Sequence, residues 1–246
     1  MALGLTQVTV MGKPRVGIIS SGDEIVSPEE DLKPGQVRDV NAYTLGALVE
    51  RNGGVAVRYG IIADQADALQ TVATHALMEC DTVVITAGSS ASTRDFTAQV
   101  INTLGSPGVL VHGVNIRPDK PTILVVCNGK AVIGLPGNPV SALVIASLFF
   151  VPVLDALLKL RSAEDIHHGY LRPSIKAMLS VNIPSQAGRE DWIPVKLTFT
   201  TDGFHAEPVF GKSNLIFTLV RADGLVCVPS DITGLSAGEL VEVVFL

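Results

Sequence analysis

The 246-residue sequence is poor in cysteine, with only Cys80, Cys127 and Cys227. The three are odd in number and far apart, which excludes a disulfide framework and the paired spacing of a structural zinc site. This usage favours a reducing compartment. No apolar signal core precedes the first basic residue, Lys13, so we expect a cytoplasmic protein.

The chain also lacks runs of basic residues, and its 24 acidic side chains outnumber its 18 basic ones, for a net charge of −6. Nucleic-acid binders carry a basic patch, so nucleic acid is not an expected partner. The uncharged stretch 139–154 is interrupted by Ser141, Ser147 and Pro152 and is shorter than a membrane-spanning helix prefers. We interpret it as a buried helix and expect no membrane partner.

Several catalytic signatures are missing as well. The sequence contains no nucleophile elbow, Walker loop, dinucleotide-binding fingerprint or Cys/His pair. Its five histidines show no metal-ligand spacing. Any chemistry must therefore come from carboxylates, hydroxyls, a few cations and glycine-rich turns.

The sequence does contain a repeated alternation of apolar strands and amphipathic helices. Short apolar runs at residues 15–19, 55–62 and 82–86 are each followed by a segment of helical periodicity, the first of which we expect Asn41 to cap. This alternation predicts an α/β fold, a mostly parallel sheet with helices on both faces. We expect this domain to cover residues 13–165, with residues 1–12 as the remnant of a preceding linker or strand.

The pattern changes near residue 161, where helical periodicity fades. Short β-rich runs separated by glycine follow at residues 176–182, 191–200, 205–209, 216–220, 225–228 and 239–245. They predict a small all-β, barrel-like domain over residues 170–246.

Polar residues follow three of the predicted strands, and the carboxyl ends of parallel strands meet at one edge of a sheet. These residues are Ser21, Gly22, Asp23 and Glu24 after the first strand, Gly88, Ser90 and Asp95 after the third, and Gly137, Asn138 and Pro139 after the last. With Asn138 as N-cap and Pro139 as the first helical residue, the last turn aims backbone N–H groups at one point, which suits an anion.

Charged residues near this turn suggest which groups could bind the anion. Glu24 and Asp95 could hold a divalent metal such as Mg²⁺ against phosphate oxygens, or they could simply decorate a turn and cap a helix. Arg117 and Lys120 lie three residues apart on a proline-stiffened loop, where they could converge on one small oxyanion or remain solvated.

Together, the motifs resemble the molybdopterin molybdenumtransferase family of MoeA and the gephyrin E domain. They read Ser20-Ser-Gly-Asp-Glu24, Gly60-Ile-Ile-Ala-Asp64, Thr86-Ala-Gly-Ser-Ser90 with Asp95, Arg117-Pro-Asp-Lys-Pro121 and Gly134-Leu-Pro-Gly-Asn-Pro-Val-Ser141. That family inserts molybdate into adenylylated molybdopterin and releases AMP in a Mg²⁺-dependent step. The resemblance therefore implies a transferase of molybdenum cofactor biosynthesis that uses these ligands. It also implies a homodimer in the full-length family and contact with other molybdenum cofactor enzymes.

The resemblance implies roles for individual residues. Glu24, Asp64 and Asp95 match the essential acidic residues, and Glu24 and Asp95 would also hold the metal. The residues expected to bind molybdopterin are Ser21, Gly22, Asp23, Gly88, Ser90, Gly137, Asn138 and Pro139. Those expected to bind molybdate are Arg117, Lys120, Pro121, Ser141 and Ser213.

The sequence departs from the family pattern at several places. Ala87 and Ser92 replace glycines, and Asp119 adds a negative charge beside the oxyanion site. The arginine that the family commonly has close to Pro194 is absent, with Arg189 as a candidate replacement. The chain starts where the family's N-terminal domains would end, so we expect it to bind ligands without completing molybdenum insertion alone. The alternatives are a non-catalytic pterin-binding or assembly module and molybdopterin adenylyltransferase. The 87–90 loop and the residues beyond 170 argue against the latter.

Overall fold

A six-stranded sheet forms the centre of the first domain of the computed structural model, which describes residues 3–87, 91–118, 121–160 and 172–246 (for 91–96, the backbone only). The strands, in spatial order, are β4 (Val55–Ile62), β1 (Arg15–Ser21), β5 (Thr82–Ala87), β9 (Lys130–Leu135), β8 (Ile123–Cys127) and β6 (Pro107–His112). The first four pair in parallel, whereas β8 and β6 are antiparallel. The predicted, mostly parallel sheet is confirmed.

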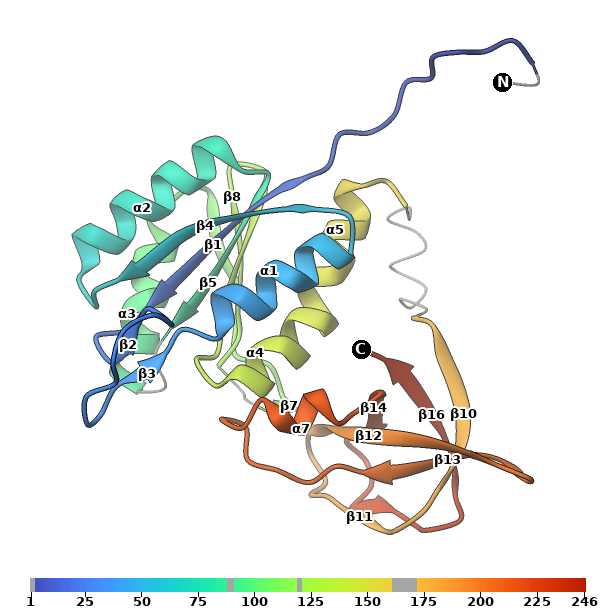
Figure 1. Cartoon of the computed structure of the whole chain (residues 1–246). Coiled ribbons are helices and arrows are strands. Elements are labelled where there is room, and N and C mark those ends of the chain that lie inside the picture. Colours follow the sequence, from blue (N-terminus) through green and yellow to red (C-terminus); the bar gives the residue numbers. More distant parts are fainter. Residues whose placement is uncertain (1–2, 88–90, 119–120, 161–171) are drawn as a thin grey trace.

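Helices cover both faces of this sheet (Figure 1). One face packs against α1 (Asn41–Arg51) and a continuous helical segment made of α4 (Pro139–Ile145), η1 (Ala146–Phe150) and α5 (Val151–Leu157). The other face packs against α2 (Ala66–Glu79) and α3 (Ala91–Asn102). Successive residues of β1 point to opposite faces, so Ile18 lies in one core cluster and Ile19 in the other. Burial on both faces explains why these strands are almost continuously apolar.

The apolar segment Pro139–Leu157 is a core helix. Among the described residues it is the one helix with the length and composition of a membrane span, with a mean hydropathy of 2.3, but half of it is buried within the molecule. Its π-helical turn η1 ends at Phe150, two residues before Pro152. Proline has no N–H to donate to the carbonyl four residues earlier and its ring crowds that carbonyl, so a wider turn accommodates it.

The second domain is a closed β-barrel. Its strands are β10 (Ser174–Leu179), β12 (Glu190–Thr200), β13 (Gly203–Pro208), β14 (Gly224–Val228) and β16 (Leu240–Phe245), with β11 (Ile183–Pro184) and β15 (Gly234–Leu235) paired beside it. Because β13 pairs with both β10 and β12, the order β13-β10-β16-β14-β12 closes on itself. Its interior is apolar, and the predicted small all-β domain is confirmed.

The strand predicted at residues 216–220 is wrong, because the structure has the short helix α7 (Phe217–Val220) there. The β-branched residues of this segment suggested a strand. However, its buried residues, Thr218 and Leu219, are adjacent in sequence and do not alternate with exposed ones. Leu219 packs with Leu225 against Val140 and Val144 of α4, and one helical turn suffices for that contact.

A strand pairing and an apolar cluster help to join the two domains. The short strand β7 (Ile116–Arg117) leaves the first domain and pairs in parallel with β12 of the barrel. The apolar cluster around Val140 and Leu219 spans the same interface. A small ribbon of β2 (Ile25–Val26) and β3 (Val37–Arg38) completes the first domain, and residues 3–13 lead into β1 as an exposed, extended segment (Figure 1).

Candidate functional site

Buried hydroxyl groups gather at the sheet edge where β1, β5 and β9 end. Ser20, Thr86, Thr122 and Ser141 are all fully buried, and Thr86 Oγ1 donates to Ser20 Oγ over 3.4 Å. The hydroxyls of Thr122 and Ser141 have no hydrogen-bond partner among the residues that the structure describes. Buried hydroxyls are normally paired, so this edge is polar beyond what the core requires.

Three of the predicted residues come together beside this edge, at the ends of β1 and β4. The hydroxyl of Ser21 donates to Asp64 Oδ1 over 2.9 Å, and the backbone N–H of Asp64 donates to Asp23 Oδ1 over 3.1 Å. Gly22 continues the pairing, since its N–H donates to the Ile62 carbonyl over 3.2 Å. Ser21 is fully buried, so its hydroxyl orients the Asp64 carboxylate.

A cavity of about 590 Å³, here called the Glu24 chamber, is lined by two carboxylates and by the glycine turn at residues 137–139, which follows strand β9. Its wall includes Glu24, Leu32, residues 35–41, residues 137–139 and Asn214. Glu24 and Asp39 supply the carboxylates. Arg38 also lines the chamber, while its guanidinium donates to the backbone carbonyls of Pro28 and Glu30.

Asn41 ties helix α1 to the glycine turn at the base of this chamber. Its Nδ2 donates to the Gly137 carbonyl over 2.8 Å, while its buried Oδ1 has no partner among the described residues. The predicted capping role of Asn41 is wrong, because Asp39 Oδ1 accepts the Ala42 N–H over 3.0 Å in that role. Asp39 precedes the helix, and its carboxylate accepts the N–H of a residue in the first helical turn. The Asn41 amide is therefore left to contact the glycine turn at Gly137.

A second cavity, of about 720 Å³, lies between the two domains and is here called the interdomain cleft. The first domain contributes Arg117, Pro118, Asn138 and Val140 to its wall, and the barrel contributes Pro184, residues 192–194, residues 209–214 and Thr218. The cleft shares Asn138 and Asn214 with the Glu24 chamber, so the two cavities adjoin.

The start of helix α4 separates the two cavities, and it differs from the predicted anion cradle. Asn138 does occupy the N-cap position with Pro139 after it, but its side chain makes no capping hydrogen bond. The N–H of Val140 donates to the carbonyl of Ser213 over 3.0 Å. One N–H group expected to face an anion is therefore used to hold the two domains together.

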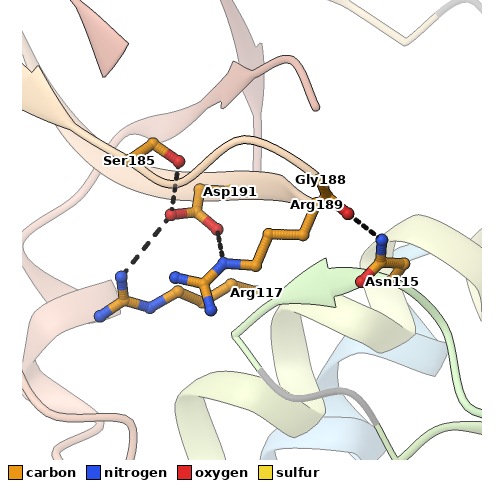
Figure 2. A network of polar contacts seen from close by, with 6 residues as sticks. All are labelled: Asn115, Arg117, Ser185, Gly188, Arg189 and Asp191. Carbon is orange, nitrogen blue, oxygen red and sulfur yellow. Dashed lines mark hydrogen bonds and ion pairs between the residues drawn. The ribbon is translucent and has the colours of Figure 1, made fainter. Parts of the chain in front are cut away.

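A buried carboxylate connects the two domains at the cleft (Figure 2). Asp191 of β12 is fully buried; its Oδ1 accepts from Arg189 Nε over 2.9 Å, and its Oδ2 accepts from Ser185 Oγ over 2.8 Å. Arg117 of β7 forms an ion pair with it, with 3.6 Å between Nη1 and Oδ2. Among the described residues, Arg117 is the arginine that lines the cleft, and Arg189 does not line it.

Each of the two domains matches a known protein family. Residues 17–156, more than half of the chain, match the family described as "Probable molybdopterin binding domain". The chain belongs to this molybdopterin-binding family. Residues 176–246 match the "MoeA C-terminal region (domain IV)". Both matches confirm the resemblance seen in the sequence motifs.

Individual relatives agree with this assignment. Molybdopterin molybdenumtransferase of Nostoc sp. is 32% identical over 246 residues, covering 98% of this chain and 55% of the relative. A molybdopterin biosynthesis protein of Methanocaldococcus jannaschii is 33% identical over 255 residues, covering 100% and 58%. The crystal structure of a molybdopterin biosynthesis MoeA protein from Pyrococcus horikoshii superposes with a TM-score of 0.80 at 36% identity, covering 95% of this chain and 54% of that one. The chain thus spans just over half the length of these relatives.

The structure places the predicted residues of this family member in several groups. Glu24, Gly137, Asn138 and Pro139 line the Glu24 chamber, and Arg117, Asn138 and Ser213 line the interdomain cleft. Pro121 and Ser141 are described but line neither cavity, and Ser21, Asp23 and Asp64 form the separate group at the ends of β1 and β4. Gly88, Ser90 and Lys120, and the side chain of Asp95, lie outside the described residues.

Sequence reasoning missed several residues that line the two cavities. Lys212 and Asn214 flank Ser213, and Trp192 is the single tryptophan of the chain. Lys212 could have been identified as a cation beside the predicted serine. Asp39 and Asn41 could have been found only by placing the 24–41 loop against the glycine turn.

The chemistry of the Glu24 chamber suits a hard cation that shares its coordination with a ligand. The described residues contain no group of three or more His, Cys, Asp or Glu side chains that could hold a metal by themselves. Glu24 and Asp39 nevertheless place two carboxylates at one cavity, and Asn41, whose Oδ1 is buried without a partner among the described residues, lines it beside them. Mg²⁺ is commonly bound by one or two carboxylates together with water and substrate phosphates, so these residues fit it.

The thiol of Cys227 lies beside the Asp191 network and should be inert. Burial raises its pKa to about 12, and the negative charges of Glu190 and Asp191 act in the same direction. A raised pKa keeps the thiol protonated, so at pH 8 we expect it to react with a disulfide reagent roughly a thousandfold more slowly than free cysteine. Absorbance of the released thiolate measures this rate. Cys80 and Cys127 are buried, so they should react only after unfolding in guanidinium chloride, and rapid native labelling of any of the three cysteines would contradict the prediction.

Proposed function

We propose that this chain forms a site that binds adenylylated molybdopterin and molybdate for molybdenum insertion with release of AMP. The observation that carries the proposal is the pair of adjoining cavities at the sheet edge and domain interface. The Glu24 chamber offers carboxylates and a glycine turn, and the interdomain cleft offers Arg117, Lys212 and Ser213. The first set suits a phosphate-bearing ligand with its metal ion, and the second suits a tetrahedral oxyanion.

Each cavity has a distinct task in this proposal. Arg117 and Lys212 attract molybdate into the cleft, and the hydroxyl of Ser213 donates a hydrogen bond to it. Asn138 and Asn214, shared by both cavities, bring the oxyanion next to the pterin ligand. Mg²⁺ bound through Glu24, with Asp39 or Asp95 as its second carboxylate, would neutralise the phosphate that leaves with AMP. The side chain of Asp64, oriented by Ser21, remains the proposed acidic partner at the edge.

The single tryptophan gives a direct test of ligand binding in the cleft. Trp192 lines the interdomain cleft, so occupancy should change its fluorescence. We expect saturable changes on titration of the purified chain with molybdate, tungstate or adenylylated molybdopterin. Arg117→Gln should weaken oxyanion binding about tenfold, because it removes a charge-assisted donor.

Two controls make this titration specific. Lys196→Gln removes an equal charge from an exposed position on β12 and should leave oxyanion affinity within about twofold. Gly137→Val should weaken binding of adenylylated molybdopterin, because it adds bulk to the turn beside Asn41. Equal affinities of the wild-type, Arg117→Gln and Gly137→Val chains would refute the proposed site.

A second candidate function is a module that binds the pterin without turnover. Pro194 lines the cleft, and the arginine that the family commonly has close to this position is absent from the sequence, so the site has one cation fewer. Under this alternative both ligands bind, but no AMP is released when molybdate and Mg²⁺ are added together, even after an N-terminal fragment of a full-length relative is supplied. A homodimer and contacts with other molybdenum cofactor enzymes are further parts of the proposal, which sedimentation of the purified chain tests first.

A further inference from the structure

Two arginines from different domains share one buried carboxylate beside the interdomain cleft, and one of them, Arg117, lines that cleft. Arg189 donates to Asp191 from within the barrel, whereas Arg117 approaches it from the first domain (Figure 2). The side chain of Asp191 is completely inaccessible, while the side chain of Arg117 is 58% exposed. The three side chains together carry one net positive charge, and Arg117 is the more exposed of the two arginines, since the side chain of Arg189 is 32% exposed.

Arg189 and Arg117 contact Asp191 in different ways. Burying a carboxylate costs several kcal/mol unless it is paired and hydrogen-bonded, and Arg189 and Ser185 already satisfy Asp191 from the barrel side. Arg117 is therefore not required to neutralise Asp191. At 3.6 Å its Nη1 lies beyond ordinary hydrogen-bond distance, so the attraction orients the guanidinium while its N–H groups remain able to donate to a ligand.

The backbone fixes the position of this pair. Arg117 of β7 stands opposite Asp191 of β12 in the parallel pairing that joins the domains. Beside them, the N–H of Glu190 donates to the Asn115 carbonyl over 3.1 Å, and the Asn115 side chain contacts the Gly188 carbonyl. The approach of Arg117 to Asp191 is thus built into the domain interface.

We propose that Asp191 is the positioning residue of the oxyanion site. It holds the Arg117 guanidinium at the cleft wall, so that its planar set of donors meets one tetrahedral oxyanion, and the β7–β12 pairing makes this arrangement depend on docking of the two domains. This inference rests on the proposed function, and it assigns the oxyanion-binding cation to a residue whose orientation is set by the other domain.

The sign of one mutational effect separates positioning from simple electrostatics. Asp191 carries a negative charge close to the oxyanion site, so if it had no positioning role, Asp191→Asn would strengthen oxyanion binding. A positioning role predicts weaker binding, by about tenfold, because Arg117 loses the partner that orients it.

The test is equilibrium dialysis with molybdate on the whole chain. Asp191→Asn and Arg117→Gln should each weaken binding about tenfold, and the double variant should be no weaker than Arg117→Gln alone, because the first acts through the second. Glu207→Gln, which removes an exposed negative charge from the barrel, should change affinity by less than about twofold. Unchanged or tighter binding by Asp191→Asn, or additive losses in the double variant, would overturn the inference.

A second variant covers the case in which Asp191→Asn fails to fold, as circular dichroism would reveal. Arg117→Lys, at a largely exposed side chain, keeps the charge but replaces the planar group with a single ammonium. We expect it to lose about tenfold in affinity, and retained affinity would contradict a positioned guanidinium. Absence of molybdate binding by the wild-type chain would refute the proposed function itself, whereas wild-type binding with unaffected variants refutes the positioning role alone.

Discussion

Changing Glu24 to glutamine is expected to weaken the Mg²⁺-dependent binding of adenylylated molybdopterin about a hundredfold. Glutamine keeps the shape and the hydrogen-bonding capacity of the side chain but removes the charge that attracts a divalent cation. Glu24 lines the chamber with Asp39, so its loss leaves one carboxylate there among the described residues. The phosphate of the ligand would then lack most of its neutralising partner.

Titration with and without EDTA, followed by Trp192 fluorescence, measures this effect. The wild-type affinity should fall when EDTA removes the metal, whereas the Glu24→Gln affinity should be nearly insensitive to EDTA. Asp31→Asn, at an exposed carboxylate of the same loop, should behave as the wild type. An equal loss for Glu24→Gln in the presence and absence of Mg²⁺ would show that the carboxylate contacts the ligand without a metal.

The sequence predicts the first domain well because its pattern is locally consistent. β1 and β5 are buried on both faces, so their apolar runs stand out, and α1 and α2 show helical periodicity between them. The six runs beyond residue 173 also mark the barrel, with one error at residues 216–220. That error arises because β-branched residues favour strands, while the domain interface requires only one helical turn at Leu219.

The candidate site was predictable to the extent that a parallel sheet brings its strand ends together. Glu24, Gly137 and Asn138 do share one chamber, as the strand-edge argument implied. The pairing of β7 with β12 could not be read from the sequence, because a strand of two residues has no periodicity. Consequently no sequence pattern indicated that Asp191, in the other domain, lies opposite Arg117. Nor could it show that the Ser213 carbonyl accepts the N–H of Val140.

These long-range contacts explain why the site depends on the domain interface. Helix α4 packs against both the sheet of the first domain and Leu219 and Leu225 of the barrel. Its first turn carries Asn138 and Val140 into the cleft. The stability of this helical segment therefore affects both the fold of the first domain and the geometry of the proposed site.

Changing Phe150 to alanine is accordingly expected to lower the free energy of unfolding by about 3–5 kcal/mol. Phe150 is 1% exposed, lies at the end of the π-helical turn η1, and belongs to the core cluster beneath α1 and α4. Removing its ring loses buried apolar area and leaves a cavity that the close-packed helix and sheet cannot fill. Urea unfolding followed by far-UV circular dichroism measures the change.

The adjacent Phe149 provides a matched control with the same chemistry and a different environment. It is only partly buried, against the edge of the same cluster, so Phe149→Ala should cost roughly 1–2 kcal/mol. At a temperature where both variants remain folded, each should still bind molybdate, because neither phenylalanine lines the cleft. Equal destabilisation by the two changes would contradict the assignment of Phe150 to the core, since burial is the property in which the two positions differ.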